Sequence, residues 1–194
     1  LGYYPPAGGC ITVGGRQLDR ISISSLRRNT GAVMQEGYIF PDTILGNIAP
    51  GEDNPDIDSV AEAVKVASLK QLLDELPSGL QTRVGQGGHG LSQGQRQRIL
   101  IARVVYKQPS LLLLDEATSA LDASNERMIV ENLAGFYAGR TVVIVAHRLS
   151  TVRHADRIVV LEGGRVTESG SHAELAALKG TYYRLIKDQL ELGG

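Results

Sequence analysis

Residues 111–116 read Leu-Leu-Leu-Leu-Asp-Glu, an apolar run that ends in two acidic side chains. A short apolar run without polar alternation is typical of a strand buried on both faces of a sheet. Ligands of open α/β sheets bind at the carboxyl ends of strands, which is where Asp115 and Glu116 are expected. The aspartate suits magnesium bound to nucleotide phosphates, and the glutamate suits an attacking water. The alternative is an ordinary carboxylate pair that caps the next helix.

The sequence after this run continues to alternate between helix and strand. Further apolar runs occur at 141–145 and 157–161, and a helical pattern spans 123–137. Strand, helix, strand alternation indicates a parallel sheet, so all three runs are predicted to be buried strands. The pair Gly163-Gly164 then predicts a turn into a further strand at 165–168. Two helices are expected to close the chain, at 171–178 and 182–192.

The residues before this run divide into a strand-containing part and a helical part. A hairpin is predicted at 10–18, because Gly14-Gly15 permits the positive φ of a tight turn, and a strand is predicted at 31–35. From 43 to 108, apolar residues recur at helical spacing, which predicts a mostly helical subdomain. The predicted division is therefore 1–42 and 109–194 as parts of one α/β core, with 43–108 as the helical subdomain.

A second candidate site lies at Leu91-Ser92-Gln93-Gly94-Gln95, directly before a run of good helix formers. Ser92 stands where an N-cap residue would stand. A helix N-terminus with a small, glycine-containing entry offers free backbone N–H groups and a positive dipole end, which favour a phosphate. A plain helix cap is the alternative.

Taken together, these segments resemble the ATP-binding cassette of ABC transporters, in the order that the family has them. Residues 91–95 resemble its signature motif, and 111–122 resemble its Walker B motif and D-loop. Gln35 is similar to the Q-loop glutamine, and His147 is similar to the switch histidine. Gly85-Gln86 resembles the segment that precedes the signature in exporters. The resemblance covers nearly the whole chain and implies a P-loop NTPase-like α/β fold, with a parallel-sheet core and a helical subdomain.

The resemblance also implies an ATPase that uses ATP and Mg²⁺, with a role for each matching residue. Asp115 and Gln35 would bind the metal, while Glu116, His147 and Gln35 would act in hydrolysis. The residues expected to contact ATP, in part that of a second cassette, are Ser92, Gln93, Gly94, Gln95 and Asp122. Asp122 would also help to join the two sites of the pair.

The partners implied by the resemblance are a second cassette, paired head to tail, and the transmembrane domains of an exporter. The cassette would lie at the cytoplasmic face of the membrane, and its coupling surface would include residues 36–42. The alternative for Tyr38 and Phe40 is simple packing into the core. A net charge of -1 without a dense basic run argues against nucleic acid as a partner.

One part of the family pattern has no counterpart in the sequence. A phosphate-binding loop needs Gly-Lys followed by Ser or Thr. The five lysines are Lys65, Lys70, Lys107, Lys179 and Lys187, and none follows a glycine or precedes a hydroxyl residue. The chain therefore resembles a cassette truncated at its N-terminus, and we expect it to be inactive alone. Without that loop's central strand, unpaired strand edges are also expected.

The sequence departs from the family pattern at two further positions. Gln93 stands where glycine is commonest in the signature, and Gln86 stands where exporters often carry glutamate. The second departure puts communication with the membrane domain in question. One alternative function is a soluble, non-transport ABC ATPase, although neither a heptad insertion nor a basic linker separates Gln35 from Leu91. The other is a non-hydrolysing module that lends its signature face to a partner.

Overall fold

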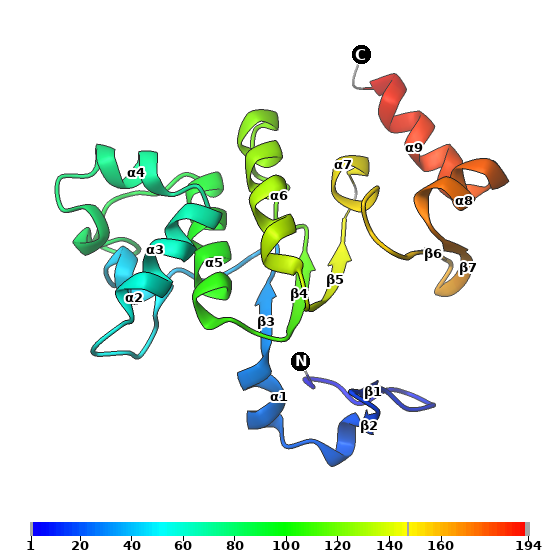
Figure 1. The fold of residues 1–194 in the computed structure, drawn as a ribbon, viewed down its shortest axis with the longest axis horizontal. Helices are drawn as coiled ribbons and strands as arrows, with labels where there is room; N and C mark the ends of the chain where they lie inside the picture. The colour runs from blue at the N-terminus through cyan, green and yellow to red at the C-terminus, as the bar shows by residue number, and fades with distance from the viewer. Residues whose placement is uncertain (1, 147, 193–194) are drawn as a thin grey trace. The chain divides into compact units, whose positions relative to one another are not determined.

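The computed structural model describes residues 2–146 and 148–192 (Figure 1). They form two compact units, with the boundary between Val143 and Ile144. The division predicted from the sequence, at 42/43 and 108/109, stays a prediction.

A three-stranded sheet forms the centre of the first unit. Its strands are β3 (Thr30–Val33), β4 (Leu111–Asp115) and β5 (Thr141–Val145), in the order β3-β4-β5, and the boundary between the two units falls within β5. β3 and β4 run parallel, with a register from Thr30 opposite Leu111 to Val33 opposite Leu114. The predicted parallel sheet is confirmed, and the carboxyl ends of β3 and β4 meet at one edge.

β5 is an edge strand of this sheet within the described part of the chain. Val143 and Val145 are each about half exposed, so the prediction that this run is buried on both faces is wrong. An edge strand offers unpaired N–H and C=O groups on its outer side.

The elements before β3 are short and local. They are β1 (Thr12–Val13), β2 (Arg16–Gln17), the 3₁₀ turn η1 (Leu18–Arg20) and α1 (Ile23–Asn29). β1 and β2 form the predicted hairpin, and both turn glycines, Gly14 and Gly15, have positive φ. A residue far along the sequence binds the C-terminal end of α1: Lys107 Nζ donates to the carbonyl oxygens of Arg27 (2.6 Å) and Thr30 (2.8 Å).

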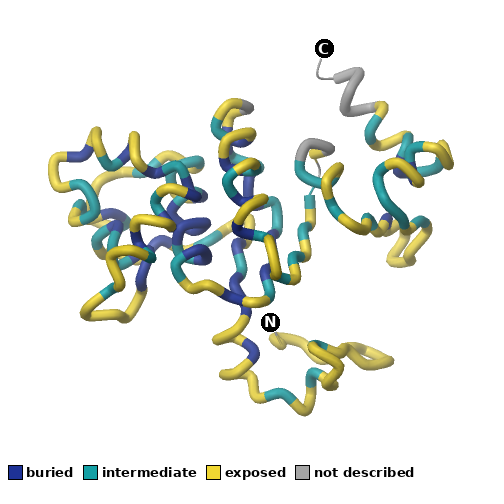
Figure 2. The backbone as a smooth tube through the Cα atoms, viewed as in Figure 1, coloured by how far each residue is buried: buried dark blue, intermediate teal, exposed yellow. Residues whose placement is uncertain are grey.

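The segment between β3 and β4 is helical, as predicted. Its elements are α2 (Ile44–Ile48), α3 (Ile57–Val66), α4 (Lys70–Glu75), η2 (Gly79–Gln81) and α5 (Gln93–Lys107). α5 packs against α2, α3 and β3, and most of its residues from Gln97 to Val105 are buried (Figure 2). This one helix therefore connects the helical segment to the sheet.

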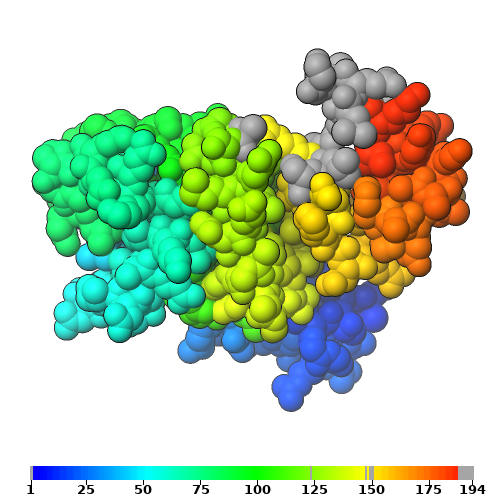
Figure 3. Space-filling model, turned by 45° about the horizontal axis from the view of Figure 1, so that its top comes forward, coloured from blue at the N-terminus to red at the C-terminus, as the bar shows by residue number. Residues whose placement is uncertain are grey.

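α6 (Ala123–Tyr137) follows β4 and contacts α3. Asn132 of α6 donates to the carbonyl oxygens of Lys65 (3.3 Å) and Val66 (3.4 Å), and to Ser68 Oγ (3.2 Å). Figure 3 shows the residues of α3 and α6 side by side at the surface. No helix of the described residues is both long and apolar enough to span a bilayer.

A buried polar network fixes the loop after β3. Asn47 is fully buried in α2; its Oδ1 accepts from the N–H of Phe40 (2.8 Å), and its Nδ2 donates to the carbonyl of Phe40 (3.0 Å). Arg103 of α5 donates to Asn47 O (2.7 Å), Asn47 Oδ1 (2.9 Å) and Tyr38 O (3.0 Å). Burial lowers the pKa of the Arg103 guanidinium, since desolvation disfavours its charged form. The network therefore ties α2, α5 and the loop together.

Replacing Asn47 with alanine should lower the free energy of unfolding by about 2–3 kcal/mol, because it leaves the Phe40 amide and an Arg103 donor without their partner. Urea denaturation measures the change. The matched control is Asn54→Ala, at an exposed position, where a change within about 0.5 kcal/mol is expected. Equal midpoints for the two variants would contradict this account of the loop.

The second unit is built on an antiparallel hairpin. Its elements are α7 (Leu149–Val152), β6 (Ile158–Glu162), β7 (Arg165–Gly170), α8 (His172–Leu178) and α9 (Thr181–Leu192). Val160, Leu175 and Tyr182 form its buried cluster. Val160 lies on the face of β6 that packs in this cluster, whereas Val159 and Leu161 are exposed.

The prediction that 157–161 is a buried strand of the parallel sheet is therefore wrong. β6 pairs antiparallel with β7 across the Gly163-Gly164 turn, and the two form a sheet of their own. The physical reason is that a short apolar run fits either a strand buried on both faces or a hairpin strand with one packed face.

Candidate functional site

The carboxyl ends of β3 and β4 bring three predicted site residues to one edge of the sheet. Asp115 ends β4, Glu116 follows it, and Gln35 lies two residues beyond β3. Asp115 and Glu116 are partly buried, whereas Gln35 is exposed. The described residues contain no group of three or more His, Cys, Asp or Glu side chains placed to bind a metal. One carboxylate and one amide oxygen nevertheless suit Mg²⁺, which usually takes few protein ligands and completes its shell with phosphates and water.

Glu116 begins a tight, well-fixed turn. Its φ is +47°, in the left-handed region that residues with a Cβ rarely adopt. Its carbonyl accepts from the N–H of Ser119 (3.0 Å), and the carbonyl of Thr118 accepts from the N–H of Leu121 (3.1 Å). Thr118 is buried and donates to Glu126 Oε1 (3.0 Å). The backbone that carries the Glu116 carboxylate is therefore constrained from several sides.

Asp122 ends this turn as the N-cap of α6. Its Oδ1 accepts from the N–H groups of Ser124 (3.1 Å) and Asn125 (3.0 Å), and its Oδ2 accepts from Asn125 Nδ2 (2.6 Å). The backbone N–H of Asn125 is the main reason that the pKa of Asp122 lies below its usual value. This capping role was not expected from the sequence, and the expected role between two cassettes stays a prediction.

Ser92 is the N-cap of α5, as predicted, and it forms a capping box with Gln95. Ser92 Oγ accepts from the N–H of Gln95 (3.2 Å), and Gln95 Oε1 accepts from the N–H of Ser92 (2.8 Å). The N–H groups of Gln93 and Gly94 have no acceptor within the helix. The Ser92 hydroxyl also keeps its proton for a further acceptor. The first turn of α5 therefore presents several donors and the positive end of a helix dipole.

This first turn packs closely against the turn after β4. A Cβ added to Gly94 would lie 3.2 Å from the carbonyl oxygen of Ala120. Gln97, one turn further along α5, donates to the carbonyl of Glu116 (2.9 Å) and accepts from the N–H of Ala120 (3.1 Å). Sequence reasoning missed Gln97, because a glutamine among good helix formers gives no sign of burial.

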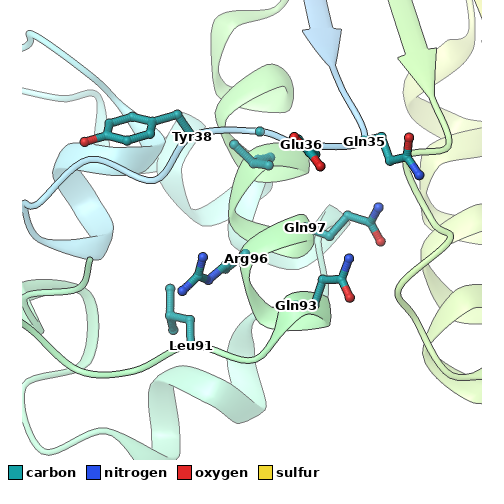
Figure 4. A pocket seen from close by; sticks show the side chains of 9 residues that line it. Gln35, Glu36, Tyr38, Leu91, Gln93, Arg96 and Gln97 are labelled. Atoms are coloured by element: carbon teal, nitrogen blue, oxygen red, sulfur yellow. The ribbon is translucent and has the colours of Figure 1, made fainter. Parts of the chain in front are cut away.

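A pocket of about 420 Å³ lies between the loop after β3 and the first half of α5 (Figure 4). Gln35 and Gln97 lie on one side of this pocket in the view, with Gln93 below them. The lining residues are Gln35, Glu36, Gly37, Tyr38, Leu91, Gln93, Arg96, Gln97 and Leu100. The pocket thus brings together two predicted site residues, Gln35 and Gln93, from elements distant in sequence.

Beyond the pocket, the loop exposes two aromatic rings. Tyr38 is 66% exposed and Phe40 is 41% exposed, and their ring centroids lie 5.3 Å apart in an edge-to-face arrangement. The alternative that both rings pack into the core is therefore wrong. His147, the remaining predicted site residue, lies outside the described residues.

The family described as "ABC transporter" matches residues 1–119. The "ABC transporter B family member 2" of Dictyostelium discoideum is 44% identical over 187 residues, which cover 96% of this chain and 13% of that protein. An "ATP-dependent lipid A-core flippase" of Cupriavidus metallidurans is 45% identical over 190 residues, which cover 96% of this chain and 32% of that protein.

Among solved structures, the fold matches one described as "Structure of a bacterial Atm1-family ABC exporter with ATP bound". The TM-score is 0.91 at 40% identity, and the match covers 96% of this chain and 33% of that chain. The chain thus spans at most about a third of the length of these relatives.

Proposed function

Because the chain belongs to the ABC transporter family, whose ATP-binding domain it resembles in fold, we propose that it forms part of the ATP-hydrolysing motor of a membrane exporter. The exporter and flippase relatives support this direction of transport. The observation that carries the proposal is the parallel register of β3 and β4, by which Gln35 and the pair Asp115-Glu116 share one edge of the sheet. The motor lies at the cytoplasmic face of the membrane.

The acidic pair and Gln35 have separate tasks in this proposal. Asp115 and Gln35 would hold Mg²⁺, and the ion would supply positive charge to stabilise the phosphates of ATP. Glu116 accepts a hydrogen bond from the attacking water and orients it or removes its proton. His147 donates to the terminal phosphate. The fixed turn at 116–121 supports this role, because phosphoryl transfer depends mainly on positioning and electrostatics.

The first turn of α5 serves a second cassette in the proposal. Ser92, Gln93, Gly94 and Gln95 lie together there. The N–H groups of Gln93 and Gly94 and the hydroxyl of Ser92, which the capping box leaves available as donors, suit the terminal phosphate of ATP held by the partner. Asp122, at the next helix N-terminus along the chain, helps to join the two sites. The head-to-tail pair is therefore the active unit.

The exposed aromatic rings of Tyr38 and Phe40 suit a surface that receives the transmembrane part. Large apolar side chains that remain exposed in this way are typical of interaction sites. The Asn47–Arg103 network supports the same role, since it holds the backbone of this loop in place.

Residues 1–194 by themselves lack strong phosphate binding in this proposal, because no lysine follows a glycine. Lys107 donates to the end of α1, and Lys70 forms an ion pair with Asp74 (2.9 Å), so both are engaged elsewhere. The lack of a Gly-Lys pair among residues 1–194 favours one competing function, a binding module that never hydrolyses ATP.

An ATPase assay on the full-length polypeptide that carries residues 1–194, reconstituted in liposomes, tests the proposal. We expect Mg²⁺-dependent hydrolysis, and Asp115→Asn should raise the Mg²⁺ concentration needed for half-maximal rate by at least about tenfold, since one charged ligand is lost. Asp74→Asn, on the exposed face of α4, is the control and should leave the requirement unchanged. Absence of ATPase activity in the wild type would favour the binding module.

A further inference from the structure

Gln97 is a buried polar residue in the middle of the first half of α5. Its side chain is 4% exposed, although glutamine is usually a surface residue. Both ends of its amide are used, since Nε2 donates to Glu116 O (2.9 Å) and Oε1 accepts from Ala120 N (3.1 Å). Gln97 therefore spans the turn from its first residue to its fifth.

One of the two backbone groups that Gln97 binds belongs to a residue in a strained conformation. Glu116 has a positive φ, and such a conformation persists only when its surroundings hold it. The amide of Gln97 reaches the Glu116 carbonyl from a different helix, and the close approach of Gly94 to Ala120 keeps that helix near. A side chain of another length would not bridge the same two backbone groups.

We propose that Gln97 is a positioning residue for hydrolysis, which holds Glu116 in its working orientation through the backbone of the turn. The inference rests on the proposed function, in which the Glu116 carboxylate directs the attacking water. Gln97 lies on the same helix as Ser92 and Gly94. Gln97 thereby links the first turn of α5, which contacts the nucleotide of the partner cassette, to the Glu116 carboxylate, which acts on the nucleotide bound to its own cassette.

The variant Gln97→Met keeps the length and volume of the side chain and removes both hydrogen bonds. In the full-length polypeptide we expect kcat, expressed per ATP-binding site, to fall roughly 10- to 100-fold, with KM for ATP within about twofold. Counting sites by equilibrium binding removes any loss of folded protein from the rate. Gln71→Met, on the exposed face of α4, is the matched control and should leave kcat unchanged.

A second variant separates positioning from folding. Gln97→Glu keeps the acceptor for Ala120 N–H and loses the donor to Glu116 O. Because it also buries a charge beside that carbonyl, its folded fraction is counted by equilibrium binding as well, and kcat per site should still fall at least about tenfold. In a Glu116→Gln background, either Gln97 substitution should change the residual rate less than twofold, because the two residues act as a unit.

The outcomes separate this inference from the proposed function. If the wild type hydrolyses ATP and both Gln97 variants keep its kcat per site, the positioning role is overturned while the proposed function stands. Additive effects of Gln97 and Glu116 substitutions would overturn it as well. If the wild type hydrolyses no ATP, the proposed function falls, and the inference falls with it.

Discussion

The full-length polypeptide with Glu116→Gln is expected to hydrolyse ATP at least about 100-fold more slowly than the wild type, while its affinity for ATP changes by no more than a few-fold. Glutamine keeps the shape of the side chain and cannot accept a proton from water, and general-base catalysis is commonly worth 10²–10⁴-fold. The turn that carries residue 116 is fixed by backbone and buried side-chain hydrogen bonds, so the substitution should not disturb it. Steady-state ATPase rates and equilibrium nucleotide binding measure the two effects.

Glu131→Gln provides the control for this prediction. Glu131 lies on an exposed face of α6, and the same chemical change there should leave the rate within about twofold of wild type. A Glu116→Gln enzyme that kept more than half of the wild-type rate would remove Glu116 from the mechanism.

The second large effect concerns residues 1–194 as an isolated polypeptide. We expect them to bind Mg-ATP at least about 100-fold more weakly than the full-length polypeptide and to show no measurable turnover. In P-loop NTPases the backbone of the phosphate loop and its lysine cradle the β- and γ-phosphates, and no Gly-Lys pair is present among these residues.

Titration calorimetry of the isolated polypeptide measures this affinity directly. The comparison requires folded protein, so a far-ultraviolet circular dichroism spectrum with the expected helix content is the accompanying control. A micromolar dissociation constant for Mg-ATP would contradict the prediction and would mean that other groups of the chain bind the phosphates.

Local sequence patterns were sufficient to predict several helices and strands. The helix predicted at 123–137 and the strand predicted at 141–145 have the observed bounds, and the hairpin around Gly14-Gly15 is present. Each is determined by nearby residues, through helical periodicity, β-branched content or turn glycines. The place of Asp115 at the carboxyl end of a strand could also be predicted, from the apolar run that precedes it.

Contacts between distant segments could not be predicted in this way. The hydrogen bonds of Gln97 to the turn at 116–120, and of Lys107 to the end of α1, join residues that no local pattern relates. The wrong prediction for 157–161 has a similar origin, since the apolar content of a strand does not say which strand it will pair with.

Because Glu116 has a positive φ, the residue that the backbone favours at this position differs from the residue that the proposed ATP hydrolysis needs. A residue with a Cβ in this conformation is disfavoured by roughly 1–2 kcal/mol, a cost that glycine does not incur. In backbone conformation alone glycine would therefore be favoured at this position, by less than this cost because glycine also gains freedom in the unfolded state, and it would lack the carboxylate. Glutamate at this position is tolerated by the fold and required by the proposed chemistry. Selection for a relaxed backbone alone would be expected to discard the residue that directs the attacking water in the proposed mechanism.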